Sequence, residues 1–129
     1  MSSLGAARYI SLTTFRANGE GVPTAVWVVD APGELWVTTR LGSYKVARLH
    51  ADPRVTVVEC DIRGVVAEGA VPVAGTAVVD TSAATRAQLD ALMEEKYDER
   101  FRQMRAAASA RIPRPESVAL RITLDGAST

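Results

Sequence analysis

Basic residues gather where a predicted strand meets a predicted short helix. Between residues 40 and 54 the charged side chains at neutral pH are Arg40, Lys45, Arg48 and Arg54 against the single acid Asp52. Ser43 stands where a helix N-cap is expected. A helix N-terminus presents unpaired N–H groups and the positive end of the helix dipole, so this junction could hold a phosphate or a carboxylate. The candidate anion-binding residues are Thr38, Thr39, Ser43, Lys45 and Arg48.

The same spacing has a simpler interpretation. Ser43 could cap the helix and do nothing else, while the cations stay solvated on the protein surface. Spacing alone does not decide between an anion site and an ordinary capped helix.

No other part of the sequence has the pattern of a catalytic or metal centre. It contains no Gly-x-Ser-x-Gly elbow, no phosphate loop, no Gly-x-Gly-x-x-Gly after a strand and no His-x-x-x-His pair. The single histidine, His50, lies at a helix end, where a cation complements the dipole. Glu94 and Glu95 are adjacent on a helix, and Asp61 flanks a turn. We therefore predict no metal site and no side-chain general acid or base.

Composition limits the class of protein. The 129 residues include 15 basic and 15 acidic side chains, which argues against a nucleic-acid-binding surface. This length predicts a single domain over residues 1 to 129, with residues 1 to 7 as a flexible leader. One cysteine, Cys60, excludes an intrachain disulfide and is expected in the core. Without a signal peptide or an apolar run of ~18 residues, the protein is expected to be soluble and cytoplasmic, with no membrane contact.

The elements that would position the basic residues are mostly strands. β-Branched and apolar runs predict strands over residues 9 to 15, 22 to 30 and 35 to 39. The short connections between these strands favour an antiparallel meander, because parallel pairs need long crossovers. A short helix over residues 43 to 51 follows, and a fourth strand covers residues 54 to 60.

The second half of the chain contains one long apolar stretch and one long helix. Residues 65 to 80 include Gly69, Pro72 and Gly75, which predicts a kinked or bulged strand pair with Pro72 at an edge. Thr81 or Ser82 caps the helix, which is expected to break near Tyr97–Asp98. Its apolar residues recur mostly at three- and four-residue steps: Leu89, Leu92, Met93, Tyr97, Phe101 and Met104.

The end of the chain completes the predicted fold. Residues 112 to 115 are expected to form a linker, and residues 118 to 124 a last strand. Six or seven strands with two helices and no regular βα alternation predict a mainly β (α+β) fold, a small antiparallel barrel that carries helices.

Several segments together resemble a known family. Residues 9 to 16, the Val26–Trp27 pair, residues 45 to 48, residues 52 to 57 and the Cys60-Asp61-x-Arg63-Gly64 turn follow one another at the spacing of the pyridoxamine-phosphate-oxidase-like split-barrel proteins. The branch that looks most similar is the deazaflavin-dependent (coenzyme F-420) oxidoreductases of actinobacteria. The resemblance covers about residues 9 to 80, and Lys96–Tyr97 and the last strand are similar to the family's C-terminal part.

The resemblance implies a split β-barrel, FMN-binding-like, that forms a homodimer with two cofactor clefts at the subunit interface. It places the cofactor phosphate and tail on Thr38, Thr39, Ser43, Lys45 and Arg48. It places the ring against Thr14, Val26 and Trp27, under a hairpin of the partner subunit near Pro72 and Val73. The implied chemistry is hydride transfer from reduced coenzyme F-420 to a small organic acceptor, with the cofactor supplying the electronics and the protein the placement.

Three residues depart from the family's pattern, and two other readings of the site stay open. Tyr44 stands where many relatives have glycine, Ala47 where a second lysine is frequent, and Asp98 where glycine is usual. The first alternative is an enzyme of the same fold that binds FMN, whose single phosphate would also suit Lys45 and Ser43. The second is a non-catalytic protein that binds or carries a cofactor or another planar ligand, since no obligatory acid, base or nucleophile is present.

Overall fold

The strands and helices below come from a computed structural model that describes residues 3 to 31, 33 to 110 and 116 to 125. Within these ranges the strands are β1 Tyr9–Phe15, β2 Gly21–Val26, β3 Val29–Ala31, β4 Glu34–Arg40, β5 Arg54–Cys60, β6 Val73–Asp80 and β7 Ser117–Leu124. The helices are α1 Tyr44–Ala51, α2 Ala83–Tyr97, α3 Glu99–Ser109 and the short 3-10 helix η1 Ser3–Ala6.

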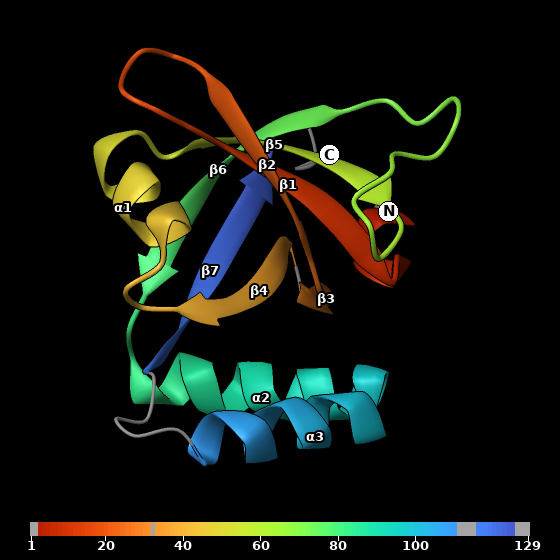
Figure 1. Ribbon diagram of the computed structural model, residues 1–129, viewed down its shortest axis with the longest axis vertical. Helices are drawn as coiled ribbons and strands as arrows, with labels where there is room; N and C mark the ends of the chain where they lie inside the picture. Colours follow the sequence, from red (N-terminus) through yellow and green to blue (C-terminus); the bar gives the residue numbers. More distant parts are fainter. Residues whose placement is uncertain (1–2, 32, 111–115, 126–129) are drawn as a thin grey trace.

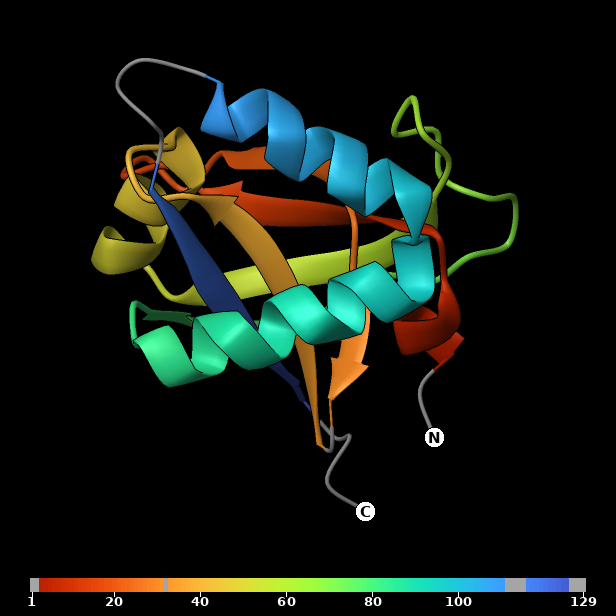
Figure 2. The same cartoon turned by 90° about the horizontal axis from the view of Figure 1, so that it is seen from below.

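The described strands form one antiparallel sheet in the order β2-β1-β5-β6-β7-β4-β3 (Figure 1). The sheet curls into a half-barrel, and α1 lies at one end of it. Helices α2 and α3 cover the outer face beside β3, β4 and β7, and they diverge from their junction (Figure 2). The predicted fold class, a small antiparallel barrel that carries helices, is confirmed.

Strand alternation divides the apolar side chains between two cores. In β4, Leu35 and Val37 face the inside of the half-barrel, while Trp36 between them faces α2 and α3. The inner core also contains Val46 and Leu49, the buried face of α1. The outer core is built mainly from α2 and α3: Leu89, Met93, Tyr97 and Phe101. Helix α1 is therefore fixed to the barrel by its apolar face, which leaves its N-terminus at the surface.

The predicted strand over residues 22 to 30 and the predicted meander are wrong. The chain leaves the sheet at Trp27–Val28, so β2 pairs with β1 at one edge and β3 pairs with β4 at the other. The cause is Val28, whose backbone bonds to side chains of α2. Its N–H donates to the Tyr97 hydroxyl at 2.9 Å, and its carbonyl accepts from Lys96 Nζ at 2.6 Å.

The predicted strand pair over residues 65 to 80 is also wrong, because only β6 forms there. Residues 61 to 72 are a loop with one isolated bridge, between Cys60 and Val66. Gly64 and Gly69 adopt φ of +85° and +81°, a left-handed backbone that interrupts strand pairing. Pro72 directly precedes β6 rather than lying within a strand.

Other predicted elements match the structure closely. Strand β1 has the predicted bounds, Ser43 and Ser82 cap α1 and α2, and the long helix breaks at Asp98. Cys60 is buried. The predicted linker over residues 112 to 115 lies outside the described residues. None of the helices in the described ranges is long and apolar enough to cross a membrane.

Part of the expected flexible leader forms regular structure. Residues 3 to 6 form η1, and the Gly5 and Ala7 carbonyls accept hydrogen bonds from Lys96 Nζ at 2.9 and 2.6 Å. Together with the contact to Val28, these bonds tie the start of the chain and the start of β3 to the end of α2. Lys96, which donates these bonds, lies about 90 residues away in sequence. The local sequence of the leader therefore could not show that this segment is held in place.

Asp98 is the one described non-glycine residue with a positive φ, at φ 56° and ψ −122°. This region strains any residue with a Cβ, by roughly 1–3 kcal/mol. Glycine relieves that strain. It also raises the conformational entropy of the unfolded chain and removes the exposed ion pair of Asp98 with Arg102, and both effects lower stability. We expect Asp98→Gly to be more stable than Asp98→Ala by about 1–2 kcal/mol in urea unfolding. Alanine is the matched control, because it removes the carboxylate and keeps the Cβ. Equal stabilities would contradict backbone strain at this position.

Asp80 ends β6 and connects it to the start of α2 and to β7. Its carboxylate accepts from the Ser82 N–H at 2.9 Å, the Thr85 hydroxyl at 2.8 Å and Arg121 Nη1 at 3.2 Å. These bonds, that of the Ser82 backbone first, lower the pKa of Asp80 from 3.8 to about 2. The side chain is 16% exposed, so solvent screens these contacts only in part.

The lowered pKa of Asp80 predicts a specific loss of stability in acid. Because the folded pKa lies below the unfolded value, the ionised carboxylate stabilises the fold above about pH 4 by about 2 kcal/mol. That stabilisation disappears as the pH falls through about 2. The free energies of unfolding in urea of the wild type and of Asp80→Asn should therefore differ at about pH 6 and converge towards about pH 2. A gap that stays constant across this range would show that the charge does not contribute.

Candidate functional site

The N-terminus of α1 carries the predicted hydroxyl groups. Ser43 is the N-cap, with extended backbone, and its Oγ accepts a long bond from the Val46 N–H at 3.4 Å. The Thr39 hydroxyl at the end of β4 lies 3.4 Å from Ser43 Oγ. Both bonds are at the long limit, so the two hydroxyl groups are weakly engaged and can bond to a ligand.

Arg48 is held in place by β1. Its Nε donates to Thr14 Oγ1 at 2.6 Å, and Thr14 is completely buried. A buried hydroxyl that accepts from a guanidinium fixes the direction of that side chain. Thr14 therefore fixes the orientation of Arg48, and the remaining N–H groups of Arg48 are available for an anion.

Arg40, Lys45 and Arg48, here called the basic cluster, lack a compensating acid. The pKa of Lys45 is lowered, first by burial and then by the charges of Arg48 and Arg40. No carboxylate forms an ion pair with any of the three within the described ranges. Arg54, by contrast, pairs with Asp52 at 2.8 Å. A bound anion would relieve the mutual repulsion of the basic cluster, so this donor set fits a phosphate or a carboxylate.

The two departures near the basic cluster do not obstruct it. Tyr44 is 83% exposed, so most of its side chain lies in solvent. Ala47 is also exposed, so a lysine at that position would add charge at the surface of α1. Neither residue covers the basic cluster. The cluster has one cation fewer than in a relative with a second lysine.

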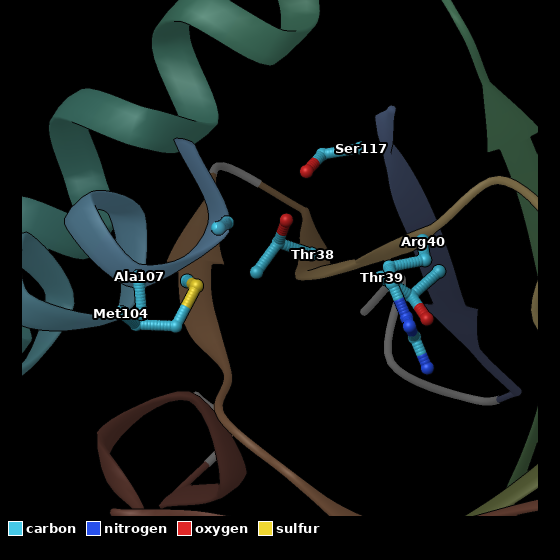
Figure 3. Close-up of a pocket in the computed structure, with 7 residues that line it drawn as sticks. Thr38, Thr39, Arg40, Met104, Ala107 and Ser117 are labelled. Atoms are coloured by element: carbon cyan, nitrogen blue, oxygen red, sulfur yellow. The ribbon is translucent and has the colours of Figure 1, made fainter. Parts of the chain in front are cut away.

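Thr38 and Thr39 lie on opposite faces of β4. Thr39 points to Ser43 and Thr38 points to α3, and both belong to the lining of a pocket of about 360 Å³ (Figure 3). The pocket lies between α3 and the adjacent ends of β4 and β7. Its lining residues are Thr38, Thr39, Arg40, Met104, Ala107, Ala108 and Ser117.

The predicted ring-contacting residues lie away from the basic cluster. Val26 pairs with Ile10 while Thr14 pairs with Val22, which puts Val26 four residues, or ~13 Å, further along the sheet. Trp27 is half-buried and stacks on Tyr97, with ring centroids 4.6 Å apart and planes 14° apart. A cofactor with its phosphate at Lys45 would have to extend along the sheet to reach Trp27.

The predicted hairpin residues belong to another part of the molecule. Pro72 is exposed at the end of the 61 to 72 loop. Val73 pairs with Val57 and packs against the inner core. No hydrogen bond or ion pair in the described ranges joins either residue to the basic cluster. The structure thus brings Thr14, Thr39, Ser43, Lys45 and Arg48 together, and leaves Thr38, Val26, Trp27, Pro72 and Val73 outside this group.

Sequence reasoning missed the α3 wall of the pocket. Met104 was assigned to the buried face of the helix, and Ala107, Ala108 and Ser117 were not considered. A signal was present, because the run of small residues from 106 to 110 leaves room beside the sheet. Lys96 was also not assigned its role as the donor to three backbone carbonyls.

The acid and base candidates lie on exposed surface. His50 and Glu59 are exposed. The Asp61 carboxylate accepts from the backbone N–H groups of Arg63 and Val65 at 2.8 and 2.9 Å, which is the predicted turn. The residues of the α1 N-terminus, by contrast, combine charge, partial burial and free hydrogen-bonding capacity at one place.

Comparison with solved structures gives the same fold. A conserved hypothetical protein of Mycobacterium tuberculosis matches 95% of this chain and 76% of its own, with TM-score 0.71 and 22% identity. HutZ, the heme storage protein of Vibrio cholerae, matches 95% of this chain and 84% of its own, with TM-score 0.69 and 15% identity. An F420 reductase matches 96% of this chain and 92% of its own, with TM-score 0.61 and 19% identity.

These structural neighbours establish the split β-barrel, and their low identities support no more than the fold. A comparison with curated proteins finds no match. The sequence model of the pyridoxamine 5'-phosphate oxidase family, however, matches residues 2 to 127, almost the whole chain. On that match, the chain belongs to the pyridoxamine 5'-phosphate oxidase family of split-barrel proteins.

Proposed function

We propose that the protein is an oxidoreductase that uses reduced coenzyme F-420 to transfer a hydride to a small organic acceptor. The observation that carries the proposal is the basic cluster at the N-terminus of α1, whose three cations have no acidic partner in the described ranges. The weakly engaged hydroxyl groups of Ser43 and Thr39 lie beside it. The fold it shares with an F420 reductase supports the choice of coenzyme.

The roles of the residues follow from their positions. Lys45, Arg48 and the Ser43 and Thr39 hydroxyl groups would hold the phosphate, while Thr14 keeps Arg48 in position. The bound deazaflavin would supply the hydride chemistry. The exposed His50, Glu59 and Asp61 do not act as general acid or base in this proposal, so solvent supplies the proton. The contribution of the protein is to bind and orient, which can provide several kcal/mol of the barrier.

A titration of the purified apoprotein tests the proposal directly. Coenzyme F-420, FMN and heme are added separately, and binding is followed by fluorescence or visible absorbance. Saturable binding of F-420, followed by oxidation of the reduced coenzyme with an added acceptor, supports the proposed enzyme. Binding of FMN alone would favour the flavin enzyme, whose single phosphate also suits Ser43 and Lys45. Binding without any turnover would favour a non-catalytic binding protein, as HutZ is a storage protein for heme.

We also propose that the protein is a cytoplasmic homodimer with the cofactor at the subunit interface. The loop of residues 61 to 72 exposes four large apolar side chains, which a second copy would cover: Ile62, Val65, Val66 and Val71. The chain has a single cysteine, Cys60, and therefore no intrachain disulfide, which suits the cytoplasm.

Light scattering coupled to gel filtration should give about twice the chain mass of 13.8 kDa at micromolar concentration. Val71→Asp should shift the protein towards the monomer, because a carboxylate buried in an apolar interface is costly. Val71 is 76% exposed in the subunit, so the substitution leaves the fold intact. A wild type that stays monomeric would remove the interfacial site from the proposal.

A further inference from the structure

The pocket beneath α3 combines an apolar wall with a polar rim (Figure 3). Met104, Ala107 and Ala108 form one wall, at the three- and four-residue steps that place side chains on one helix face. The hydroxyl groups of Thr38 and Ser117 form part of the opposite wall, and Arg40 lies on the other side of the opening from Met104. A volume of about 360 Å³ lies within the range of small-molecule sites.

The pocket exists because side-chain size falls abruptly along α3. Phe101, one turn before Met104, fills its space and is 3% exposed. Ala107 and Ala108, one turn later, leave the corresponding space empty. Arg105 fixes the distance between the walls, since it pairs with Asp90 on α2 and its Nη1 donates to Ser117 Oγ at 3.0 Å. The walls are therefore tied together around the cavity, which does not close by collapse.

Among the residues that line the pocket, Arg40 carries the one charged side chain. Arg40 is exposed and has no ion-pair partner within the described ranges. Arg86 Nη1 lies nearby, where it donates to the Ser117 carbonyl at 3.4 Å. The Thr38 hydroxyl has no hydrogen-bond partner in the part of the chain that the structure describes. An unpaired guanidinium and a hydroxyl group in the lining of a largely apolar cavity suit a carboxylate attached to an apolar body.

We infer that this pocket binds a small carboxylic acid with an apolar body, at a site that adjoins the phosphate site at α1 and shares Arg40 with it. The apolar body packs against the wall of Met104, Ala107 and Ala108, and the carboxylate contacts Arg40. Thr39 and Arg40 belong to the lining of this pocket and also lie at the phosphate site, so the two sites adjoin at the end of β4. This inference does not depend on the identity of the coenzyme.

Benzoate and benzyl alcohol are suitable probes, because they have similar shape and differ in charge. Each is titrated into the ¹⁵N-labelled apoprotein, and amide shifts are followed by NMR. Benzoate should saturate and shift the amides of Ala107, Ala108 and Ser117, with about tenfold higher affinity than benzyl alcohol. No saturable shift at these amides up to about 10 mM benzoate, about 2.7 kcal/mol of binding free energy, would overturn the inference.

Two variants separate the charge from the cavity. Arg40→Gln should weaken benzoate binding about tenfold and leave benzyl alcohol unchanged, because only the carboxylate loses its partner. Ala107→Leu should abolish binding of both probes by filling the cavity, and leucine suits an exposed helix position. Arg63→Gln, which removes an exposed arginine from the 61 to 72 loop, is the matched control and should bind like the wild type. Unaltered benzoate binding in Arg40→Gln or in Ala107→Leu would overturn the inference.

Discussion

Replacing Lys45 with alanine is expected to weaken coenzyme binding by about 1.5–3 kcal/mol, or roughly 10- to 150-fold. Lys45 is half-buried at the N-terminus of α1, next to the Ser43 hydroxyl and Arg48. A phosphate at this place would form a charge-assisted hydrogen bond with the ammonium group and meet little competing water. Equilibrium titration with coenzyme F-420, followed by fluorescence, measures the loss.

The same substitution is expected to leave the fold at least as stable. Burial and the charges of Arg48 and Arg40 lower the pKa of Lys45, so its ammonium group sits in an unfavourable field in the absence of an anion. Lys45 forms no ion pair within the described ranges, so its replacement breaks none. Affinity that falls while the urea midpoint holds or rises is typical of a residue retained for binding rather than for folding.

Arg54→Ala is the matched control for Lys45→Ala. Arg54 belongs to the same basic segment, but Asp52 neutralises it through a bond from Nη2 at 2.8 Å. Its removal should change coenzyme affinity by less than about twofold, because an exposed pair contributes little field at a distance. Equal losses in the two variants would mean that the coenzyme responds to overall charge. An unchanged affinity in Lys45→Ala would place the phosphate elsewhere.

The strands and caps that depend on neighbouring residues were predictable from the sequence. β1 consists of apolar and β-branched residues between turn residues, and its predicted bounds are correct. Ser43 was predicted as one cap and Thr81 or Ser82 as the other, because they precede amphipathic helices, and in the structure Ser43 and Ser82 accept a backbone N–H. The position of Asp98, where glycine is usual, coincided with a backbone conformation that favours glycine.

The features that depend on distant residues were not predictable in this way. The apolar run through Trp27 and Val28 has the composition of one strand, but contacts with Lys96 and Tyr97 divide it into β2 and β3. The pocket depends on how α3 packs over Thr38, which no local pattern encodes. The anion site lies between these cases, because the spacing placed Ser43 and Lys45 together but could not show that Thr14 orients Arg48.

Replacing Lys96 with methionine is expected to destabilise the fold by about 3 kcal/mol, roughly 10 °C in Tm. Each of its three N–H donors has a backbone carbonyl within range, those of Gly5, Ala7 and Val28 at 2.9, 2.6 and 2.6 Å. Methionine keeps the length of the apolar stem and removes all three bonds. The Val28 carbonyl still has a donor, the Tyr97 hydroxyl at 2.9 Å. The Gly5 and Ala7 carbonyls lose the donor that Lys96 provides.

Two effects oppose each other at Lys96, and the structure indicates which is larger. Burial, followed by the charge of Arg8, lowers the pKa of Lys96, so the ammonium group is less favourable here than in water. Three short bonds to carbonyls oppose that desolvation cost, and they connect η1, the start of β1 and the start of β3 to α2. Because Lys96→Met also leaves carbonyl groups without this donor, the loss of the bonds outweighs the relief of burying a charge.

The matched control for Lys96→Met is Lys45→Met, the same substitution at a half-buried lysine without a described hydrogen bond or ion pair. Urea unfolding should separate the two, with a loss of about 3 kcal/mol for Lys96→Met and a change within about 0.5 kcal/mol for Lys45→Met. Amide exchange should accelerate first in residues 4 to 10 and at Val28, because these segments lose their connection to α2 before the barrel opens. Similar stabilities for the two variants, or uniform acceleration of exchange, would show that Lys96 does not hold the N-terminal segment.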